Sequence, residues 1–369
     1  MRDHSPGKGL IYQGDFSAVS AWFRAPAYAH HFREPHGIHA CVPEERETMD
    51  TVLGRPMTAR RLRVAVLGGT GFVGRRVGTA FETLGHEVTR VARHALPQDD
   101  APPVRVLDLA RPDVGPIADA LRDIACDVIV NTAGGMWGLR DDQMAPANLT
   151  LVENVLAAAS TLPRPPRLVH LGSVHEYGLV PVGVSISEDD EARPVNTYAQ
   201  VKLDCTHAVT KASAQGIVDG VTLRAGNITG AGQPAASLLG VVAESLAAAS
   251  RDGRTAVVRM RSLGALRDFL NLSDAVSAIV AAATISELPG RVVNVGTGRA
   301  TSARDMVRTL IEVSGVPAEL VEEEPDAAQS TWQQMRIDLA RRYLGWSPRH
   351  DLIDGIKELW EDHMDPGGS

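Results

Sequence analysis

A chain of 369 residues with 44% hydrophobic residues is long enough to bury the core of one large domain or two smaller ones. Its formal net charge of -8 excludes the broad basic surface that a nucleic-acid partner requires. The absence of a membrane-length apolar run or a secretory signal, together with three scattered cysteines, predicts a cytoplasmic protein without a membrane partner, a disulfide framework or a metal.

Residues 1–60 are interpreted as an irregular N-terminal extension, because they sustain neither a period of two nor a period of 3.6 residues. Cys41 of this segment is preceded by a group of histidines at His30, His31, His36 and His39. A metal site is the alternative interpretation, but their spacing matches no known ligand pattern. A natural start at Met49 or Met57 also stays open.

An apolar run that leads directly into glycines occupies residues 62–74. The run predicts a buried strand, and the apolar spacing after it predicts a helix. Glycines in the turn between them permit a tight bend, close approach of a pyrophosphate, and tight packing of the helix. The free N–H groups at the helix start would then hold the anion. The dinucleotide contacts expected here are Gly68, Thr70, Gly71, Phe72, Val73 and Gly74.

Strands and helices alternate from residue 62 onward. Further strands are expected at residues 86–92, 104–107, 127–130, 167–171 and 221–223, with a helix over residues 148–162. This alternation predicts an α/β protein with a doubly wound parallel sheet and helices on both faces. Ligands in such sheets bind at the carboxyl ends of the strands, where most polar clusters of this chain fall.

The end of the second strand bears on the choice of cofactor. A site that prefers NAD usually places Asp or Glu there to bind the ribose hydroxyls. This chain has Arg93, with Arg90 and His94 nearby. Because a guanidinium suits a 2′-phosphate, we expect NADP(H), with NAD possible, over the alternative that Arg93 is a solvated surface residue.

Three reacting groups are predicted from spacing. Tyr198 and Lys202 are four residues apart, so they share one face of a helix that residues 194–197 would introduce. The lysine charge is expected to lower the cost of forming phenolate, which lets the tyrosine exchange a proton with a carbonyl or carbinol oxygen. Ser173, at the end of the fifth strand, would donate a hydrogen bond to the same oxygen.

Taken in order, these motifs resemble the extended short-chain dehydrogenase/reductases of the nucleotide-sugar epimerase/dehydratase family. The resemblance covers about residues 61–360. It rests on the glycine turn, Ser173 with Tyr177-Gly178, Tyr198 with Lys202, and residues 223–227, 267–274, 294–298 and 344–348. The resemblance implies a Rossmann domain, a nucleotide-sugar substrate and a homodimer.

The resemblance also implies roles for residues that match the family motifs. Ser173, Tyr198 and Lys202 resemble its catalytic triad. Further cofactor contacts are expected at Asp108, Leu109, Asn131, Ala133 and Asn148. Substrate contacts are expected at His175, Asn227 and Arg267, where Arg267 would hold the diphosphate unless it forms an ordinary surface ion pair with Asp268. A second diphosphate arginine of the family is missing, because Ala328 stands at its position.

The residues after Ser173 bear on the type of reaction. The related 4,6-dehydratases carry an Asp-Glu pair where this chain has Val174 and His175, and the related decarboxylases carry Glu where His175 stands. Both reactions are therefore disfavoured. His175 and Glu176 either act on substrate or only bond neighbouring backbone. We expect a 4-keto-6-deoxyhexose reductase, with an epimerase that retains NAD as the alternative and a non-catalytic dinucleotide sensor as a third interpretation.

The substrate-binding part is expected at residues 229–369, after a dinucleotide-binding domain at residues 61–228, with residues 266–298 returning to that domain. Helices are expected over residues 235–250, 299–314 and 352–360. The acidic run Glu322-Glu323-Glu324 is interpreted as a solvated face.

Overall fold

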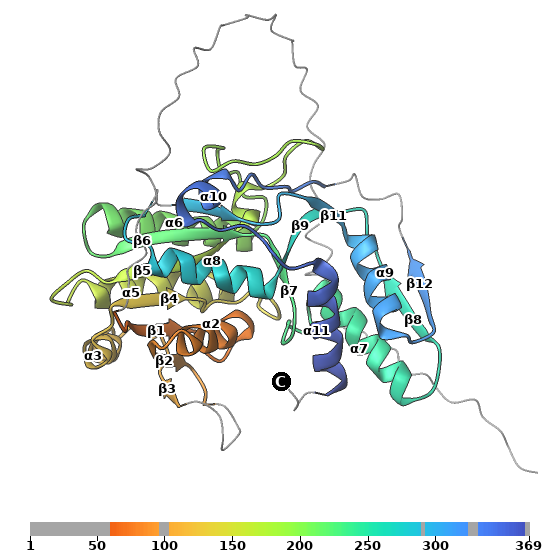
Figure 1. Ribbon diagram of the computed structural model, residues 1–369, viewed down its shortest axis with the longest axis horizontal. Coiled ribbons are helices and arrows are strands. Elements are labelled where there is room, and N and C mark those ends of the chain that lie inside the picture. Colours follow the sequence, from red (N-terminus) through yellow and green to blue (C-terminus); the bar gives the residue numbers. More distant parts are fainter. Residues whose placement is uncertain (1–59, 96–102, 289–291, 324–330, 366–369) are drawn as a thin grey trace, which may run out of the picture. The chain divides into compact units, whose positions relative to one another are not determined.

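The computed structural model describes residues 60–95, 103–288, 292–323 and 331–365 (Figure 1). The expectations for residues 1–59, including the histidines and the alternative starts, lie outside these ranges. So does Ala328. None of the helices in the described ranges has the length and apolar character needed to span a membrane.

A seven-stranded parallel sheet forms the centre of the described chain (Figure 1). In spatial order its strands are β10 (Val292–Val295), β6 (Asp219–Ala225), β5 (Arg167–Ser173), β4 (Val128–Asn131), β1 (Arg63–Leu67), β2 (Glu87–Ala92) and β3 (Val104–Val106). The chain runs outward in one direction from β1 to β3 and in the other from β4 to β10. The order therefore reverses between β1 and β4, and such a reversal opens a crevice at the carboxyl ends of the strands.

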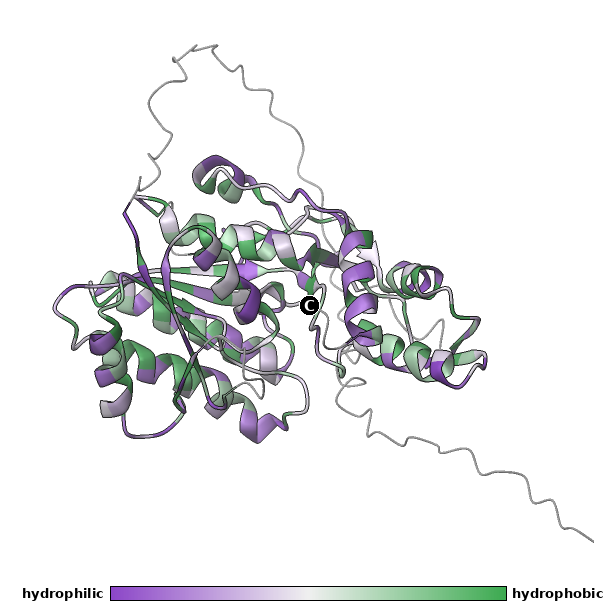
Figure 2. Cartoon of the chain, turned by 60° about the horizontal axis from the view of Figure 1, so that its bottom comes forward, coloured by the Kyte–Doolittle hydropathy of each residue, from purple (hydrophilic) through white to green (hydrophobic). Residues whose placement is uncertain are grey.

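Helices cover both faces of this sheet, and strands such as β1 and β4 accordingly consist mostly of buried valine, isoleucine and leucine. One face packs against α2 (Phe72–Thr83) and α8 (Leu272–Thr284). The other packs against α3 (Gly115–Ile124), α5 (Leu151–Ala159) and α6 (Thr197–Ala214). In Figure 2 the hydrophobic colour gathers on the strands and on the helix sides that face them. The predicted doubly wound α/β fold is confirmed.

The predicted elements differ from the observed ones mainly at their ends. The helix expected over residues 148–162 is preceded by a short α4 (Asp141–Ala145), begins as one π-helical turn, Pro146–Thr150, and only then continues as α5. The strand β10 at the sheet edge had not been assigned as a strand. The helix expected over residues 299–314 begins at Ala303, because the residues before it form β11 (Ala300–Ser302).

Two small sheets and several helices make up the rest of the chain. A three-stranded sheet joins β11, β9 (Leu266–Asn271) and β7 (Asn227–Thr229), and a parallel pair joins β8 (Ala256–Met260) to β12 (Ala318–Glu322). The accompanying helices are α7 (Leu238–Arg251), α9 (Ala303–Ser314), α10 (Asp338–Leu344) and α11 (Leu352–Met364). Serine side chains cap α7 and α9, since Ser237 accepts from the Gly240 N–H and Ser302 from the Asp305 N–H.

A buried carboxylate ties the segment before α11 to α8. Asp274 is 1% exposed and accepts hydrogen bonds from the backbone N–H groups of Arg349 and His350, at 2.9 and 3.0 Å. The His350 imidazole Nδ1 lies 2.8 Å from the same carboxylate. The carboxylate therefore accepts from two backbone N–H groups that come 75 and 76 residues later in the chain.

Replacing Asp274 with alanine should lower the free energy of unfolding by about 2 to 4 kcal/mol, because two backbone N–H groups lose their acceptor. Urea unfolding monitored by circular dichroism measures this loss. Asp354→Ala, which removes a half-exposed carboxylate on α11, is the control and should stay near the wild-type value. Equal stability of the two variants would contradict the anchoring role.

Candidate active site

The glycine turn after β1 forms a cradle that side chains would fill. Gly68 has φ +76°, and its N–H donates to the Val91 carbonyl at 2.9 Å. A Cβ added at Gly74 would lie 2.2 Å from the Gly68 carbonyl oxygen. The helix α2 starts after Gly71 without a side-chain cap and without an acidic residue in its first turn. These features fit an anion at the helix start. The cradle brings together the predicted contacts Gly68, Thr70, Gly71, Phe72, Val73 and Gly74.

The turn after β4 packs directly against this cradle. Thr132 donates to the Leu67 carbonyl through both its N–H, at 3.0 Å, and its hydroxyl, at 2.8 Å. A Cβ added at Gly68 would lie 2.8 Å from the Ala133 Cα. Asn131 is 2% exposed, and its Oδ1 accepts from the Ala133 N–H at 3.0 Å. Asn131 therefore shapes the wall of the crevice through its own turn.

Asn148 lies in the π-helical turn and fastens the loop that follows β4. Its Oδ1 accepts from the Gly135 N–H at 3.2 Å, and its Nδ2 donates to the carbonyls of Gly135 and Met144 at 2.8 and 2.9 Å. Single π turns within α-helices occur frequently at functional sites. Here the turn presents a buried amide to the loop beside the crevice.

The two arginines near the end of β2 behave differently. Arg93 is exposed directly after the strand. Arg90 is 2% exposed and forms a two-pronged ion pair with Glu82 on α2, at 2.5 and 2.8 Å. The expectation that Arg90 assists at a 2′-phosphate is therefore wrong, because its guanidinium is packed under α2 against Gly78.

Asp108 and Leu109 follow β3 in a turn. The Asp108 carboxylate accepts from the Ala110 N–H at 3.1 Å, and Leu109 is 3% exposed in the core on the α3 face. The carboxylate thus caps its own turn, which leaves the backbone of these two residues as the group that a cofactor would meet.

A buried ion pair fixes the end of β5, where Ser173 lies. The Glu176 side chain is 0% exposed, and its Oε1 accepts from the Ser173 N–H at 2.8 Å. Its Oε2 accepts from the Thr206 hydroxyl and from the Arg224 Nε, both at 2.8 Å. Glu176 therefore belongs to the support of the site. It bonds neighbouring backbone, as one of the two alternatives expected, but it also binds the distant Thr206 and Arg224 side chains, which neither alternative included.

Ser173, Tyr198 and Lys202 come together above the carboxyl end of β5. The Ser173 hydroxyl accepts from the His175 N–H at 3.2 Å and is hydrogen-bonded to the Tyr198 phenol. One turn along α6, the Lys202 ammonium donates to the Leu171 carbonyl at 2.6 Å. The helix begins where residues 194–197 predicted, with the Asn196 side chain as its cap.

Burial dominates the protonation of these groups. It raises the pKa of Tyr198 to about 12, and the hydrogen bond from Ser173 offsets part of this rise. It also lowers the pKa of Lys202. The predicted lowering of the phenol pKa by Lys202 is thus not seen in the protein by itself, because burial dominates the shift and the Lys202 charge is not among its causes.

The predicted substrate residues lie next to this group. The His175 Nε2 is 3.3 Å from the Asn227 Oδ1, and the His175 ring meets the Tyr198 ring edge-on with centroids 6.3 Å apart. Burial, and secondly the charge of Arg267, lowers the pKa of His175 to about 3. The imidazole is therefore neutral at ordinary pH.

Arg267 is 8% exposed and is held by uncharged oxygens. Its guanidinium donates to the carbonyls of Leu266 and Thr331, at 2.9 and 2.8 Å, and to the Thr331 hydroxyl at 2.7 Å. Burial lowers its pKa to about 10. Asp268 accepts instead from the Thr297 and Gly298 N–H groups, so the surface ion pair between Arg267 and Asp268 is not formed.

Sequence reasoning left the role of Glu176 open and missed Thr331. The supporting role of Glu176 carried a readable signal, because Ser173-Val-His-Glu176 has the spacing of a capping box, which the structure forms. Thr331 carried none, since its contact with Arg267 joins residues 64 positions apart.

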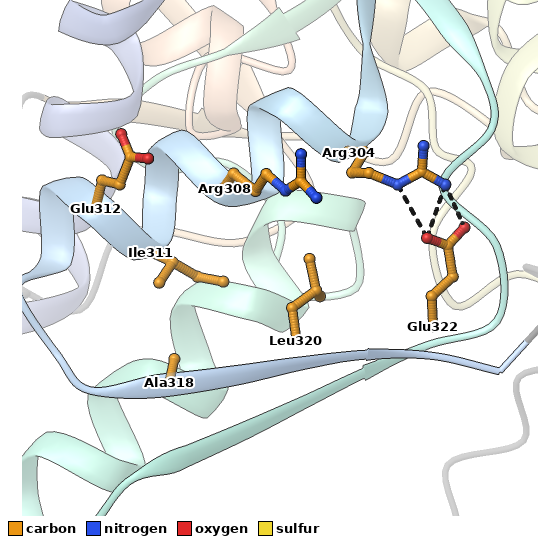
Figure 3. A pocket seen from close by; sticks show the side chains of 7 residues that line it. All are labelled: Arg304, Arg308, Ile311, Glu312, Ala318, Leu320 and Glu322. Atoms are coloured by element: carbon orange, nitrogen blue, oxygen red, sulfur yellow. Dashed lines mark hydrogen bonds and ion pairs between the residues drawn. The ribbon is translucent and has the colours of Figure 1, made fainter. Parts of the chain in front are cut away.

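A hollow of about 410 Å³ lies between α9 and β12, and none of the predicted site residues lines it (Figure 3). At one side Arg304 forms a forked ion pair with Glu322, with its closest contact at 2.8 Å. Glu322 also accepts from the Leu263 N–H at 2.7 Å. The interpretation of Glu322 as part of a solvated face is therefore wrong.

Comparison with known proteins gives one family match and several relatives. Residues 64–296 match the model of the NAD dependent epimerase/dehydratase family. The dTDP-6-deoxy-L-talose 4-dehydrogenase (NAD(P)(+)) of Kitasatospora kifunensis is 48% identical over 302 residues, which cover 81% of this chain and 94% of that protein. The GDP-6-deoxy-D-mannose reductase of Pseudomonas aeruginosa is 24% identical, with 81% and 96% covered.

Among solved structures, the UDP-glucose 4-epimerase of Thermus thermophilus in complex with NAD has a TM-score of 0.70 and 23% sequence identity. The match covers 83% of this chain and 99% of that one. At this identity the likeness supports the fold alone.

The low pKa of His175 predicts a pH dependence of stability. Between about pH 6.5 and pH 3 the unfolded chain binds a proton that folded His175 does not, so the free energy of unfolding should fall as pH falls through this window. His175→Gln should make this fall shallower, by up to about 1.4 kcal/mol per pH unit.

Urea unfolding at pH 7, 6 and 5 measures the two slopes. His207→Gln, which removes an exposed imidazole from α6, is the control for the loss of a histidine. Identical slopes for wild type and His175→Gln would show that His175 is not held neutral by its surroundings.

Proposed function

The chain belongs to the NAD-dependent epimerase/dehydratase family, and from this premise we propose that it interconverts the 4-keto and 4-hydroxy forms of a nucleotide-linked 6-deoxyhexose, with NADP(H) as the preferred cofactor. The resemblance that the sequence motifs indicated is confirmed by this membership. The predicted class, an enzyme of the NAD-dependent epimerase/dehydratase type, is confirmed as well. The substrate and the direction of the reaction are the proposal.

The observation that carries the proposal is the position of Glu176. Dehydration and decarboxylation need an acid or base beyond the tyrosine. The carboxylate that follows Ser173 is fully buried against Arg224 and Thr206, so it does not reach a substrate. Hydride chemistry at a carbinol carbon needs only the Ser173, Tyr198 and Lys202 group. The talose relative, which is named a 4-dehydrogenase, supports the same reaction type.

Each residue then has a definite task in the reduction of the ketone. Tyr198 gives its proton to the carbonyl oxygen as the carbon gains a hydride, and Ser173 donates a hydrogen bond to that oxygen. The bound nicotinamide supplies the hydride. The Lys202 ammonium beside Leu171 favours the negative charge left on the phenolate until solvent returns a proton.

Substrate binding is assigned to Arg267 and its neighbours. Within the described residues this guanidinium, which is 8% exposed, is paired only with carbonyl and hydroxyl oxygens, so it keeps donors for an anion. His175 is near both this cation and the Tyr198 ring, and its Nε2 is 3.3 Å from the Asn227 Oδ1. A diphosphate at Arg267 would therefore place its sugar toward the phenol. The homodimer, the cytoplasmic location and the domain division at residues 228 and 229 stay predictions.

Incubation of the purified protein with NADPH and a dTDP-4-keto-6-deoxyhexose should consume NADPH in a one-to-one ratio with the sugar. Tyr198→Phe should lower kcat by about 100-fold or more, because the proton donor is lost, while NADPH binding persists. Tyr343→Phe, which removes a phenol from α10, is the matched control. No NADPH consumption by a wild-type protein that retains NAD through purification would support the epimerase instead.

The preference for NADP(H) rests on Arg93. Arg93→Ala should raise the KM for NADPH by roughly tenfold and leave the KM for NADH within twofold, because only the phosphorylated ribose loses a charge-assisted partner. Initial rates at fixed sugar concentration measure both constants. Arg111→Ala, which removes another exposed arginine, controls for the change in net charge. Equal effects of Arg93→Ala on the two cofactors would remove the argument.

A further inference from the structure

His170 is a buried histidine for which the proposed reaction has no use. It lies in the middle of β5, is 1% exposed, and faces the side of the sheet that α6 covers. Its Nδ1 is 3.0 Å from the Nδ2 of Asn131 on the neighbouring strand β4. A buried titratable ring in contact with the wall of the crevice requires a physical explanation.

The hydrogen bonds of Asn131 fix which nitrogen of His170 carries the proton. The Asn131 Oδ1 already accepts from the Ala133 N–H, so the group that meets the imidazole is the Nδ2 amide, a donor. The Nδ1 of His170 must therefore accept, and in a neutral imidazole the proton then lies on Nε2. Burial, and secondly the nearby Lys202 charge, lowers the pKa of His170 well below its usual value, which agrees with a neutral ring.

The other nitrogen, Nε2, belongs to a residue whose neighbour on the next strand, Thr222, also carries a buried polar atom. Within the described residues, the Nε2 of His170 and the Oγ1 of Thr222 are both buried without a hydrogen bond. The two residues are direct neighbours in the register of β5 and β6. One is a donor and the other accepts, so a single water between them would satisfy both.

The turn that His170 holds touches the glycine cradle. The Asn131 amide orients the Ala133 N–H, Ala133 packs on Gly68, and the Thr132 hydroxyl donates to the carbonyl of Leu67 just before the cradle. We propose that His170 is a positioning residue for the dinucleotide crevice: through Nδ1 it locks the Asn131 amide and the turn after β4, and its Nε2–H is satisfied by a water shared with Thr222.

This inference rests on the proposed function only for the identity of the ligand in the crevice. The tautomer is a property of the protein alone. Long-range ¹H–¹⁵N spectra of the full chain with ¹⁵N-labelled histidine should show His170 as the neutral Nε2–H form from pH 8 to pH 5. An Nδ1–H tautomer, or a ring that becomes charged within this range, would overturn the proposal.

Two substitutions of His170 distinguish a role in positioning the cofactor crevice from a role in stability alone. His170→Asn keeps an acceptor near the place of Nδ1, whereas His170→Phe keeps the ring volume and loses the acceptor. The Kd for NADPH, measured by quenching of tryptophan fluorescence, should rise by about tenfold in His170→Phe and by less than threefold in His170→Asn. Equal Kd values in His170→Phe and wild type would overturn the proposal.

If His170→Phe fails to fold, the comparison of wild type with His170→Asn and the tautomer measurement still test the proposal. If wild type itself binds neither NADPH nor NADH, the proposed function fails and the tautomer result stands independently.

The water is tested through Thr222. Thr222→Val, which keeps the side-chain shape, should lower the urea midpoint in the wild-type background, because the His170 Nε2–H loses its bridged partner. The same substitution in the His170→Phe background should leave the midpoint unchanged or raise it. Thr210→Val, on the partly exposed side of α6, is the control for the loss of a threonine hydroxyl. An equal fall in both backgrounds would exclude the shared water.

Discussion

One buried carboxylate joins three elements, and two of them, β5 and α6, carry the candidate reacting groups. Glu176 holds the end of β5 through the Ser173 N–H, holds α6 through the Thr206 hydroxyl, and holds β6 through Arg224. Two charges in a medium of low dielectric are costly unless every oxygen and N–H is paired, so this pair favours a single arrangement of strand, helix and strand. The relative positions of Ser173 and of the helix that bears Tyr198 and Lys202 depend on it. The same contact removes the carboxylate from the substrate, so one interaction both builds the site and narrows its chemistry.

Local patterns predicted the parts of the fold that local physics determines. The glycine turn at Gly68, the valine-rich strands and the helix that begins at Thr197 are all specified within windows of a dozen residues, and all are observed. The strand β10, Val292–Val295, escaped prediction, and its length is not the reason, because β3 and β4 are no longer than β10 and were predicted. The π-helical turn before α5 escaped because helical spacing continues through it and only the span of its backbone hydrogen bonds distinguishes it from an α-helix.

The candidate site shows the same difference between features that local sequence determines and features that distant contacts determine. The spacing of Tyr198 and Lys202 predicted that they share a helix face, but not that burial would raise the pKa of the phenol, because desolvation depends on what covers the ring. Arg90 and Arg93 look equivalent in the sequence. Tertiary packing distinguishes them, because it places Arg90 under α2, beside Gly78 and paired with Glu82. Arg93 stays at the end of the strand. The contact of Arg267 with Thr331 likewise has no local signal.

The way Arg267 is held has a thermodynamic consequence for the whole molecule. A cation solvated by carbonyl and hydroxyl dipoles, with no counter-ion within the described residues, retains an unfavourable self-energy in the folded state. An anion that reaches it breaks no existing ion pair and relieves that penalty as it binds. Occupied protein should thus tolerate heat better than empty protein, and the difference should shrink as added electrolyte screens the charge. A bound anion would therefore supply the negative counter-charge that the described part of the polypeptide does not provide for Arg267.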